Sequence, residues 1–272
     1  MTDYQKELPV EGGKESSFFE HLAELRNRII KSLLSIVPGF FVAYAASEWI
    51  LKFLTHPLLE AMPPNQGLIA TALPETFLIH LKISLWGGLF ISAPFWMYQL
   101  WAFVAPGLYS SEKKATLKLT GMAFGLLVLG AGFAYQVVLP IGFKFFISFS
   151  GAEITILPTI NEYLSLITTL LLSFGVAFEM PLFLMFLASI GLVNSQKLSR
   201  FRQYAILIIV IVAAFLTPPD VISQILMSIP MLGLYELSLF LIRQKEKEKE
   251  KALLEAETNE NPSPPTEPPA KS

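Results

Sequence analysis

Residues 163–190 read YLSLITTLLLSFGVAFEMPLFLMFLASI, and this stretch indicates the fold class of the chain. An apolar run of this length is typical of a helix that crosses a membrane. Glu179 interrupts the run near its middle, and a charged side chain at that depth is costly, rare and usually functional. Glu179 is therefore a candidate functional residue. The plainer interpretation is a neutral carboxyl group that is hydrogen-bonded to a neighbouring helix.

The composition places the whole chain in the membrane class. Its 272 residues are 53% hydrophobic and only 15% charged, and the mean hydropathy is +0.54. These values are too apolar for an ordinary soluble domain. The chain has no cysteine, which excludes disulfides and thiolate chemistry. Its first 30 residues lack the pattern of a cleaved signal peptide, so we expect the first apolar segment to direct its own insertion.

Six apolar segments predict an all-α polytopic membrane domain over residues 17–242, between a polar tail (1–16) and a charged, partly disordered tail (243–272). The predicted spans are residues 29–46, 77–97, 117–139, 163–190, 204–216 and 221–242. The fifth has only about 13 apolar residues against the roughly 20 that a bilayer requires, which predicts local thinning or packing inside the protein. Pro94 and Pro181 fall inside spans and predict bends. Residues 47–76 predict a partly helical cap.

Lysine and arginine predict the orientation of the spans. Basic residues gather before the first span, in the loops after the second and fourth spans, and in the C-terminal tail. The opposite loops hold only Lys52 and Lys144. Cytoplasmic loops carry the excess of basic residues, so both termini are predicted to be cytoplasmic. Lys82, near the outer end of the second span, can extend its ammonium group outward.

The predicted cytoplasmic face displays two isolated carboxylates beside apolar surface. Ser17 and Glu20 match a capping box, which predicts a helix that starts at Ser17 and carries an ion pair between Glu24 and Arg28. The loop over residues 99–114 is rich in aromatic residues and contains Glu112, whose plainer role is an acidic residue at a helix N-terminus. On a basic face, Glu24 and Glu112 suit a ligand that presents arginine, because guanidinium pairs bidentately with carboxylate.

Four segments resemble the TatC family, the multi-spanning subunit of the twin-arginine (Sec-independent) protein translocase. Residues 21–28, HLAELRNR, are similar to its HLxELRxR signature, and residues 98–109, YQLWAFVAPGLY, to its YQxWxFxxPgLy loop. Residues 174–181, FGVAFEMP, are similar to FGxxFExP, and residues 216–224, LTPPDVISQ, to LTPPDxxSQ. The chain departs from the family at two positions. Asn27 stands where the family commonly has a basic residue, and Ser111 stands where it often has histidine.

The resemblance implies a concave, glove-like arrangement of the six helices and a receptor for signal peptides that carry paired arginines. Glu24 and Glu112 match the carboxylates that recognise the arginines, with Leu25, Arg26 and Phe103 as supporting positions. Glu179 matches an intramembrane acid on the concave side. The positions expected to shape the backbone are Pro57 in the cap, Pro94 and Pro181 in spans, and the turn Pro218, Pro219 and Asp220.

The resemblance also implies partners and a location. The partners are folded cargo with twin-arginine signal peptides, single-span TatA-type and TatB-type subunits, and membrane lipid, in an oligomeric complex without nucleic acid. The implied location is the inner membrane of a bacterium.

A secondary transporter or proton-coupled channel that uses Glu179 is the competing interpretation. Against it, the sequence shows no inverted repeat and no second membrane acid or histidine for a relay. A membrane-embedded enzyme is a weaker alternative, because His21, His56 and His80 form neither a metal-spaced cluster nor a Ser-His-Asp set. We therefore expect no catalytic residue, metal or cofactor.

Overall fold

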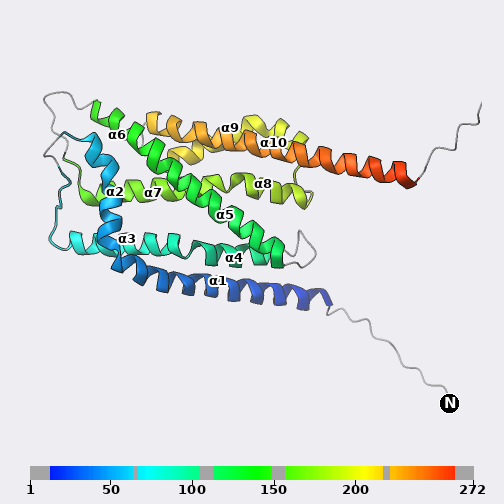
Figure 1. Ribbon diagram of the computed structural model, residues 1–272, viewed down its shortest axis with the longest axis horizontal. Coiled ribbons are helices and arrows are strands. Elements are labelled where there is room, and N and C mark those ends of the chain that lie inside the picture. Colours follow the sequence, from blue (N-terminus) through cyan, green and yellow to red (C-terminus); the bar gives the residue numbers. More distant parts are fainter. Residues whose placement is uncertain (1–12, 64–66, 105–112, 149–156, 217–220, 261–272) are drawn as a thin grey trace, which may run out of the picture. The chain divides into compact units, whose positions relative to one another are not determined.

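The structure is a computed structural model that describes residues 13–63, 67–104, 113–148, 157–216 and 221–260. These residues are almost entirely helical (Figure 1). The chain divides into two compact units, Met1–Phe178 and Glu179–Ser272, which are described separately.

The first unit contains seven α-helices and one π-helical turn within its described residues. They are α1 (Gly13–Ala45), α2 (Ser47–Ala61), α3 (Glu75–Ile91), α4 (Ala93–Val104), α5 (Lys113–Phe133), the π-turn η2 (Ala134–Val138), α6 (Leu139–Ser148) and α7 (Ile160–Phe178). The helix α1 begins four residues before Ser17, so the expectation that Ser17 caps it is wrong. A capping box is a weak local preference, and Lys14 and Glu15 are good helix formers that extend the helix by a turn.

Glycines set the closest helix contacts of the first unit. The helices α1 and α3 meet where Gly39 faces Gly88, and a Cβ atom built on Gly39 would lie 2.6 Å from the carbonyl oxygen of Gly88. The helices α5 and α7 meet at Gly130, where a Cβ atom would lie in the backbone of Phe174. Small residues let helix backbones approach closely, which is how helices associate in the absence of a hydrophobic driving force.

A bend of 50° separates α3 from α4, and Pro94 lies in the first turn of α4. Breaking the helix leaves carbonyl groups without their usual partners. The indole nitrogen of Trp96 donates a hydrogen bond of 3.0 Å to the carbonyl of Leu89, which satisfies one of them. The bend that Pro94 predicts within the second span is thus present.

The segment predicted to form a cap contains α2, which in Figure 1 runs across the ends of α1 and α3. Pro57 lies inside α2 and cannot donate to the carbonyl of Phe53, four residues earlier. Tyr135, in η2, donates its hydroxyl to that carbonyl at 2.7 Å. A two-residue bridge between Ile69 and Thr159 joins the loop after α2 to the loop before α7.

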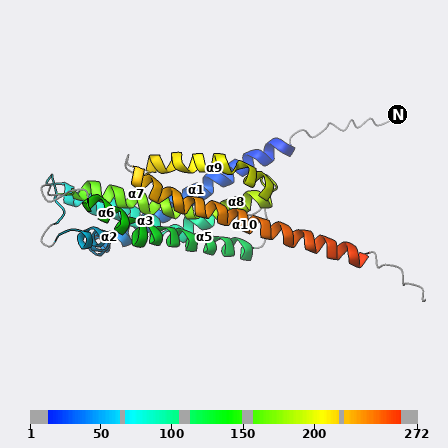
Figure 2. The same cartoon turned by 90° about the horizontal axis from the view of Figure 1, so that it is seen from above.

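The second unit contains α8 (Met180–Ser189), α9 (Ser195–Leu216) and α10 (Val221–Glu260) among its described residues. The helices α9 and α10 lie side by side (Figure 2). Tyr235 donates a hydrogen bond of 2.7 Å to the carbonyl of Leu198, and Gln224 donates one of 3.1 Å to the carbonyl of Val210. The helix α9 has 22 residues, nine more than the apolar stretch 204–216, because it starts with about two and a half more polar turns.

Five helical segments of the described residues are long and apolar enough to cross a membrane, and the bent pair α3–α4 makes a sixth if it counts as one span. The five segments are Phe19–Ala45, Thr116–Ser148, Ile160–Ser189, Ser195–Leu216 and Val221–Glu255. Large apolar side chains on their surfaces are well exposed, such as Leu34 (62%) and Phe41 (64%) on α1. A soluble protein rarely leaves such surfaces uncovered, whereas a bilayer solvates them.

Candidate functional site: a carboxylate at the junction of α1 and α4

On the polar face of α1, Glu24 accepts two hydrogen bonds from Arg28, one turn further along the helix. Arg28 donates to the same carboxylate oxygen, Oε1, from Nε at 2.9 Å and from Nη2 at 2.7 Å. The spacing i,i+4 brings these side chains together on one helix face, as the sequence predicts. The second carboxylate oxygen, Oε2, has a weaker neighbour, His21 Nδ1, at 3.8 Å.

The last turns of α4 contact the same face of α1. The ring of His21 stacks on the ring of Phe103, with centroids 4.4 Å apart and planes inclined by 18°. Arg28 Nη1 lies 3.5 Å from the amide oxygen of Gln99, at the outer limit of a hydrogen bond. Glu24 and Phe103, 79 residues apart in the sequence, therefore belong to one site through His21.

This arrangement leaves an anion accessible to a ligand. The Glu24 side chain is 43% exposed, whereas Arg28 is only 24% exposed. Because Arg28 donates only to Oε1, Oε2 keeps lone pairs that a second cation can use. Beside it, the stacked pair His21–Phe103 presents an aromatic surface, and guanidinium groups are attracted to aromatic faces. The site therefore has the chemistry to bind an arginine side chain.

The other predicted residues have different surroundings. Leu25 is half-buried and Arg26 is exposed, both on α1 next to Glu24. Glu112 lies outside the described residues, as do Pro218, Pro219 and Asp220. His21 and Gln99 were not predicted as site residues. Both fall inside the quoted sequence segments, but only the packing of α1 against α4 shows what they contact.

Glu179 lies at the break between α7 and α8, at the first residue of the second unit. Its Oε1 atom is buried and has no hydrogen-bond partner among the described residues. Its backbone carbonyl accepts a hydrogen bond of 2.9 Å from the amide of Phe183, and Pro181 lies in the first turn of α8. A buried carboxyl oxygen without a partner is rare and calls for an explanation, such as a ligand or partner that completes it.

Comparison with known proteins identifies the family. The family model for the Sec-independent protein translocase protein TatC matches residues 20–230. The chain belongs to the TatC family. It is 43% identical to the Sec-independent protein translocase protein TatC of Desulforapulum autotrophicum over 226 residues, which cover 83% of this chain and 84% of that one. The TatC protein of Aquifex aeolicus is 38% identical over 224 residues, covering 82% and 92% of the two chains.

The fold agrees with solved members of the TatC family. A crystal structure of the twin-arginine translocase receptor TatC in DDM superposes with a TM-score of 0.75 at 38% identity, and covers 82% of this chain and 99% of the other. With its apolar helices, the chain is therefore a multi-pass membrane protein of the Sec-independent translocase. The TatC name indicates a role in protein transport rather than catalysis. The described residues contain no group of three or more histidine, aspartate or glutamate side chains that could hold a metal.

Proposed function

We propose that this TatC chain is the receptor subunit that binds the signal peptides of folded cargo by their paired arginines. Glu24 and Glu112 supply the carboxylates, and Leu25, Arg26 and Phe103 are supporting positions. The observation that carries the proposal is the half-exposed Glu24 carboxylate, whose Oε2 has His21 Nδ1 of the His21–Phe103 stack as a distant neighbour at 3.8 Å and accepts no bond from Arg28. A guanidinium group forms charge-assisted hydrogen bonds with the carboxylate and stacks on the aromatic rings.

The proposal includes an orientation. Lysine and arginine residues gather in and before α1 and in the first turns of α5 and α9, which favours the cytoplasmic side for these segments and for both termini. On that side, the Glu24 site meets signal peptides before they enter the membrane. A bacterial inner membrane is the matching location.

Glu179 is proposed as the contact for single-span TatA-type and TatB-type subunits. Its buried Oε1 lacks a partner, so a polar side chain on another transmembrane helix would satisfy it. Hydrogen bonds between helices in a membrane are worth about 0.6–2 kcal/mol, which suits recruitment that must be reversed.

The test of the receptor site is a titration of the purified protein with an Arg-Arg signal peptide and with its Lys-Lys variant. Glu24→Gln keeps the shape of the side chain and removes the charge. We expect a loss of about 1.5–3 kcal/mol, or tenfold and more in affinity, together with a reduced preference for Arg-Arg. Glu112→Gln should behave in the same way.

Glu20 is the matched control, because it is an exposed glutamate one turn before Glu24 on α1. Glu20→Gln changes the net charge equally and should leave the affinity and the preference unchanged. If Glu24→Gln and Glu20→Gln bind both peptides alike, Glu24 is not the arginine receptor.

A further inference from the structure

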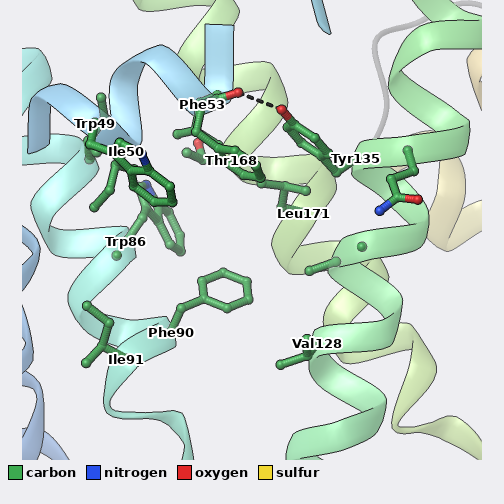
Figure 3. Close-up of a pocket in the computed structure, with 16 residues that line it drawn as sticks. Trp49, Ile50, Phe53, Trp86, Phe90, Ile91, Val128, Tyr135, Thr168 and Leu171 are labelled. Atoms are coloured by element: carbon green, nitrogen blue, oxygen red, sulfur yellow. Dashed lines mark hydrogen bonds between the residues drawn. The ribbon is translucent and has the colours of Figure 1, made fainter. Parts of the chain in front are cut away.

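An apolar cavity of about 480 Å³ lies within the first unit, between α2, α3, α5, η2 and α7 (Figure 3). Its walls include a row of stacked rings: Trp49 lies 5.7 Å from Phe53, and Phe53 lies 4.3 Å from Tyr135. Trp86 and Phe90 come from α3, which lies opposite Val128 of α5 across the cavity in Figure 3. The described residues that line it include no charged side chain. An occupant of this space must therefore be apolar and uncharged.

The volume favours a thin occupant. One turn of helix is 5.4 Å long and about 10–12 Å wide with its side chains, so it fills about 420–610 Å³. The cavity is therefore much smaller than a transmembrane helix of about 20 residues, which has more than five turns. A single hydrocarbon chain is much narrower and fits the cavity along its length. Among the components of a membrane, an acyl chain meets both the size and the polarity.

A cation lies beside the cavity, one helical turn nearer the start of α3. Lys82 directly precedes Ile83 and lies four residues before Trp86, and both of those residues line the cavity. Its ammonium group donates to Ser165 Oγ and, at 3.3 Å, to Asn161 Oδ1, both on α7. Ser165 in turn lies three residues before Thr168, another lining residue. The two helices thus hold the charge at one end of the cavity.

The partners of Lys82 are neutral, and it forms no ion pair with any carboxylate in the described part of the chain. A lysine in or near a membrane span normally has a counter-charge or extends to the headgroups. Lys82 lies seven residues after the first residue of α3, or about 10 Å along the helix at 1.5 Å per residue. Lys82 is thus within two turns of the start of α3, close enough for its side chain to extend toward lipid headgroups.

We propose that this site binds one anionic phospholipid, with its phosphate on Lys82 and one acyl chain in the cavity. Asn161 and Ser165 orient the ammonium group, and the amide of Asn161 can donate to a second phosphate oxygen. The lipid fills the space between α2, α3 and α7 and links the cap to the spans. This site is separate from the Glu24 site and does not depend on its function.

The test uses the full chain purified in detergent, with phosphatidylglycerol as the probe and native mass spectrometry as the readout. Lys82→Gln should lower the affinity for the lipid about tenfold or more, since it removes a charge-assisted contact, and Lys82→Arg should keep most of it. Lys144→Gln is the control, because Lys144 is an exposed lysine on α6. Inorganic phosphate at the same concentration should not displace the lipid, because it lacks the acyl chain.

A second pair of variants tests the acyl chain. Gly132 lines the cavity and a Cβ atom there meets nothing within 4 Å, so Gly132→Leu fills the space without a clash. Gly121, on the same helix, is equally open but does not line the cavity, and Gly121→Leu is the control. We expect phosphatidylglycerol with brominated acyl chains to quench tryptophan emission strongly in the wild type and in Gly121→Leu, and several-fold less in Gly132→Leu.

Equal lipid binding by Lys82→Gln, Lys144→Gln and the wild type would overturn the proposal. Equal quenching in Gly132→Leu and Gly121→Leu would also overturn it. So would a signal peptide or single-span subunit that displaces the lipid and then protects the cavity from quenching. Circular dichroism and gel filtration of each variant verify that a loss of binding is not a loss of fold. If Lys82→Gln does not fold, the comparison of Gly132→Leu with Gly121→Leu still decides.

Discussion

Replacing Gly39 by alanine should separate α1 from α3. A Cβ atom on Gly39 would lie 2.6 Å from the carbonyl oxygen of Gly88, and one on Gly88 would lie 2.6 Å from the amide nitrogen of Phe40. The atoms in the way belong to the backbone, so no change of rotamer relieves the clash. To reach the 3.4 Å of an ordinary contact, the helices must move apart by about 0.8 Å.

The expected cost follows from two opposing effects. Overpacking of this kind costs about 1–3 kcal/mol. Alanine in place of glycine regains up to about 1 kcal/mol of helix propensity. Gly121→Ala on α5 gains the propensity without the clash, because nothing lies within 4 Å of its Cβ position. The free energy of unfolding should therefore differ by about 1–3 kcal/mol between Gly39→Ala and Gly121→Ala, with Gly39→Ala the less stable.

The assay is reversible unfolding of both variants in the same detergent, with Gly88→Ala and the double variant added. The first alanine already moves the helices apart, so the second should cost less than it does alone. Strictly additive losses, or a Gly39→Ala protein as stable as Gly121→Ala, would show that the backbones do not touch at this point.

Two further predictions concern the contact of Gly130 with α7 and the buried carboxyl group of Glu179. Gly130→Ala should destabilise the protein by about 1–3 kcal/mol, because its Cβ atom would enter the backbone of Phe174. Gly132→Ala is the control and should not destabilise it, because nothing lies within 4 Å of its Cβ position. Equal unfolding midpoints of the two variants would contradict this prediction. Glu179→Gln should retain much of the cargo export and partner crosslinking, because an amide still forms hydrogen bonds, and Glu179→Ala should lose more of both. Signal-peptide binding should survive in both Glu179 variants, and its loss with intact partner crosslinking would exclude the proposed role.

Most features that depend on local sequence were predicted correctly, although the capping box at Ser17 did not mark the start of α1. Hydropathy predicted helices that are long and apolar enough to cross a membrane, and the structure contains them, since a membrane helix must be apolar along its own length. Pro94 predicted the bend because its ring and missing amide act on the same helix. The contact of Glu24 with Arg28 followed from the spacing of one turn. Each of these features is decided by residues within a few positions of one another.

Features that depend on distant residues were not predicted. The partner of Phe103 is His21, and the carbonyl that Pro57 releases is bound by Tyr135, 78 residues later. The sequence indicated only that Lys82 can extend outward, and it gave no sign that Ser165 and Asn161 of α7 bind its ammonium group. Sequence spacing carries no information about such pairs, because the packing of separate helices creates them. The glycine contacts were missed for the same reason.

The contact at Gly39 also bears on the proposed receptor site. Gly39 lies 15 residues after Glu24 on one continuous helix, which is about 22 Å at 1.5 Å per residue. Arg28 reaches Gln99 of α4 at 3.5 Å, so a displacement of 0.8 Å leaves no hydrogen bond between them. The stack of His21 on Phe103 depends on the same approach of α1 to α4. If that approach positions Glu24, then Gly39→Ala weakens Arg-Arg peptide binding from a distance, and Gly121→Ala does not.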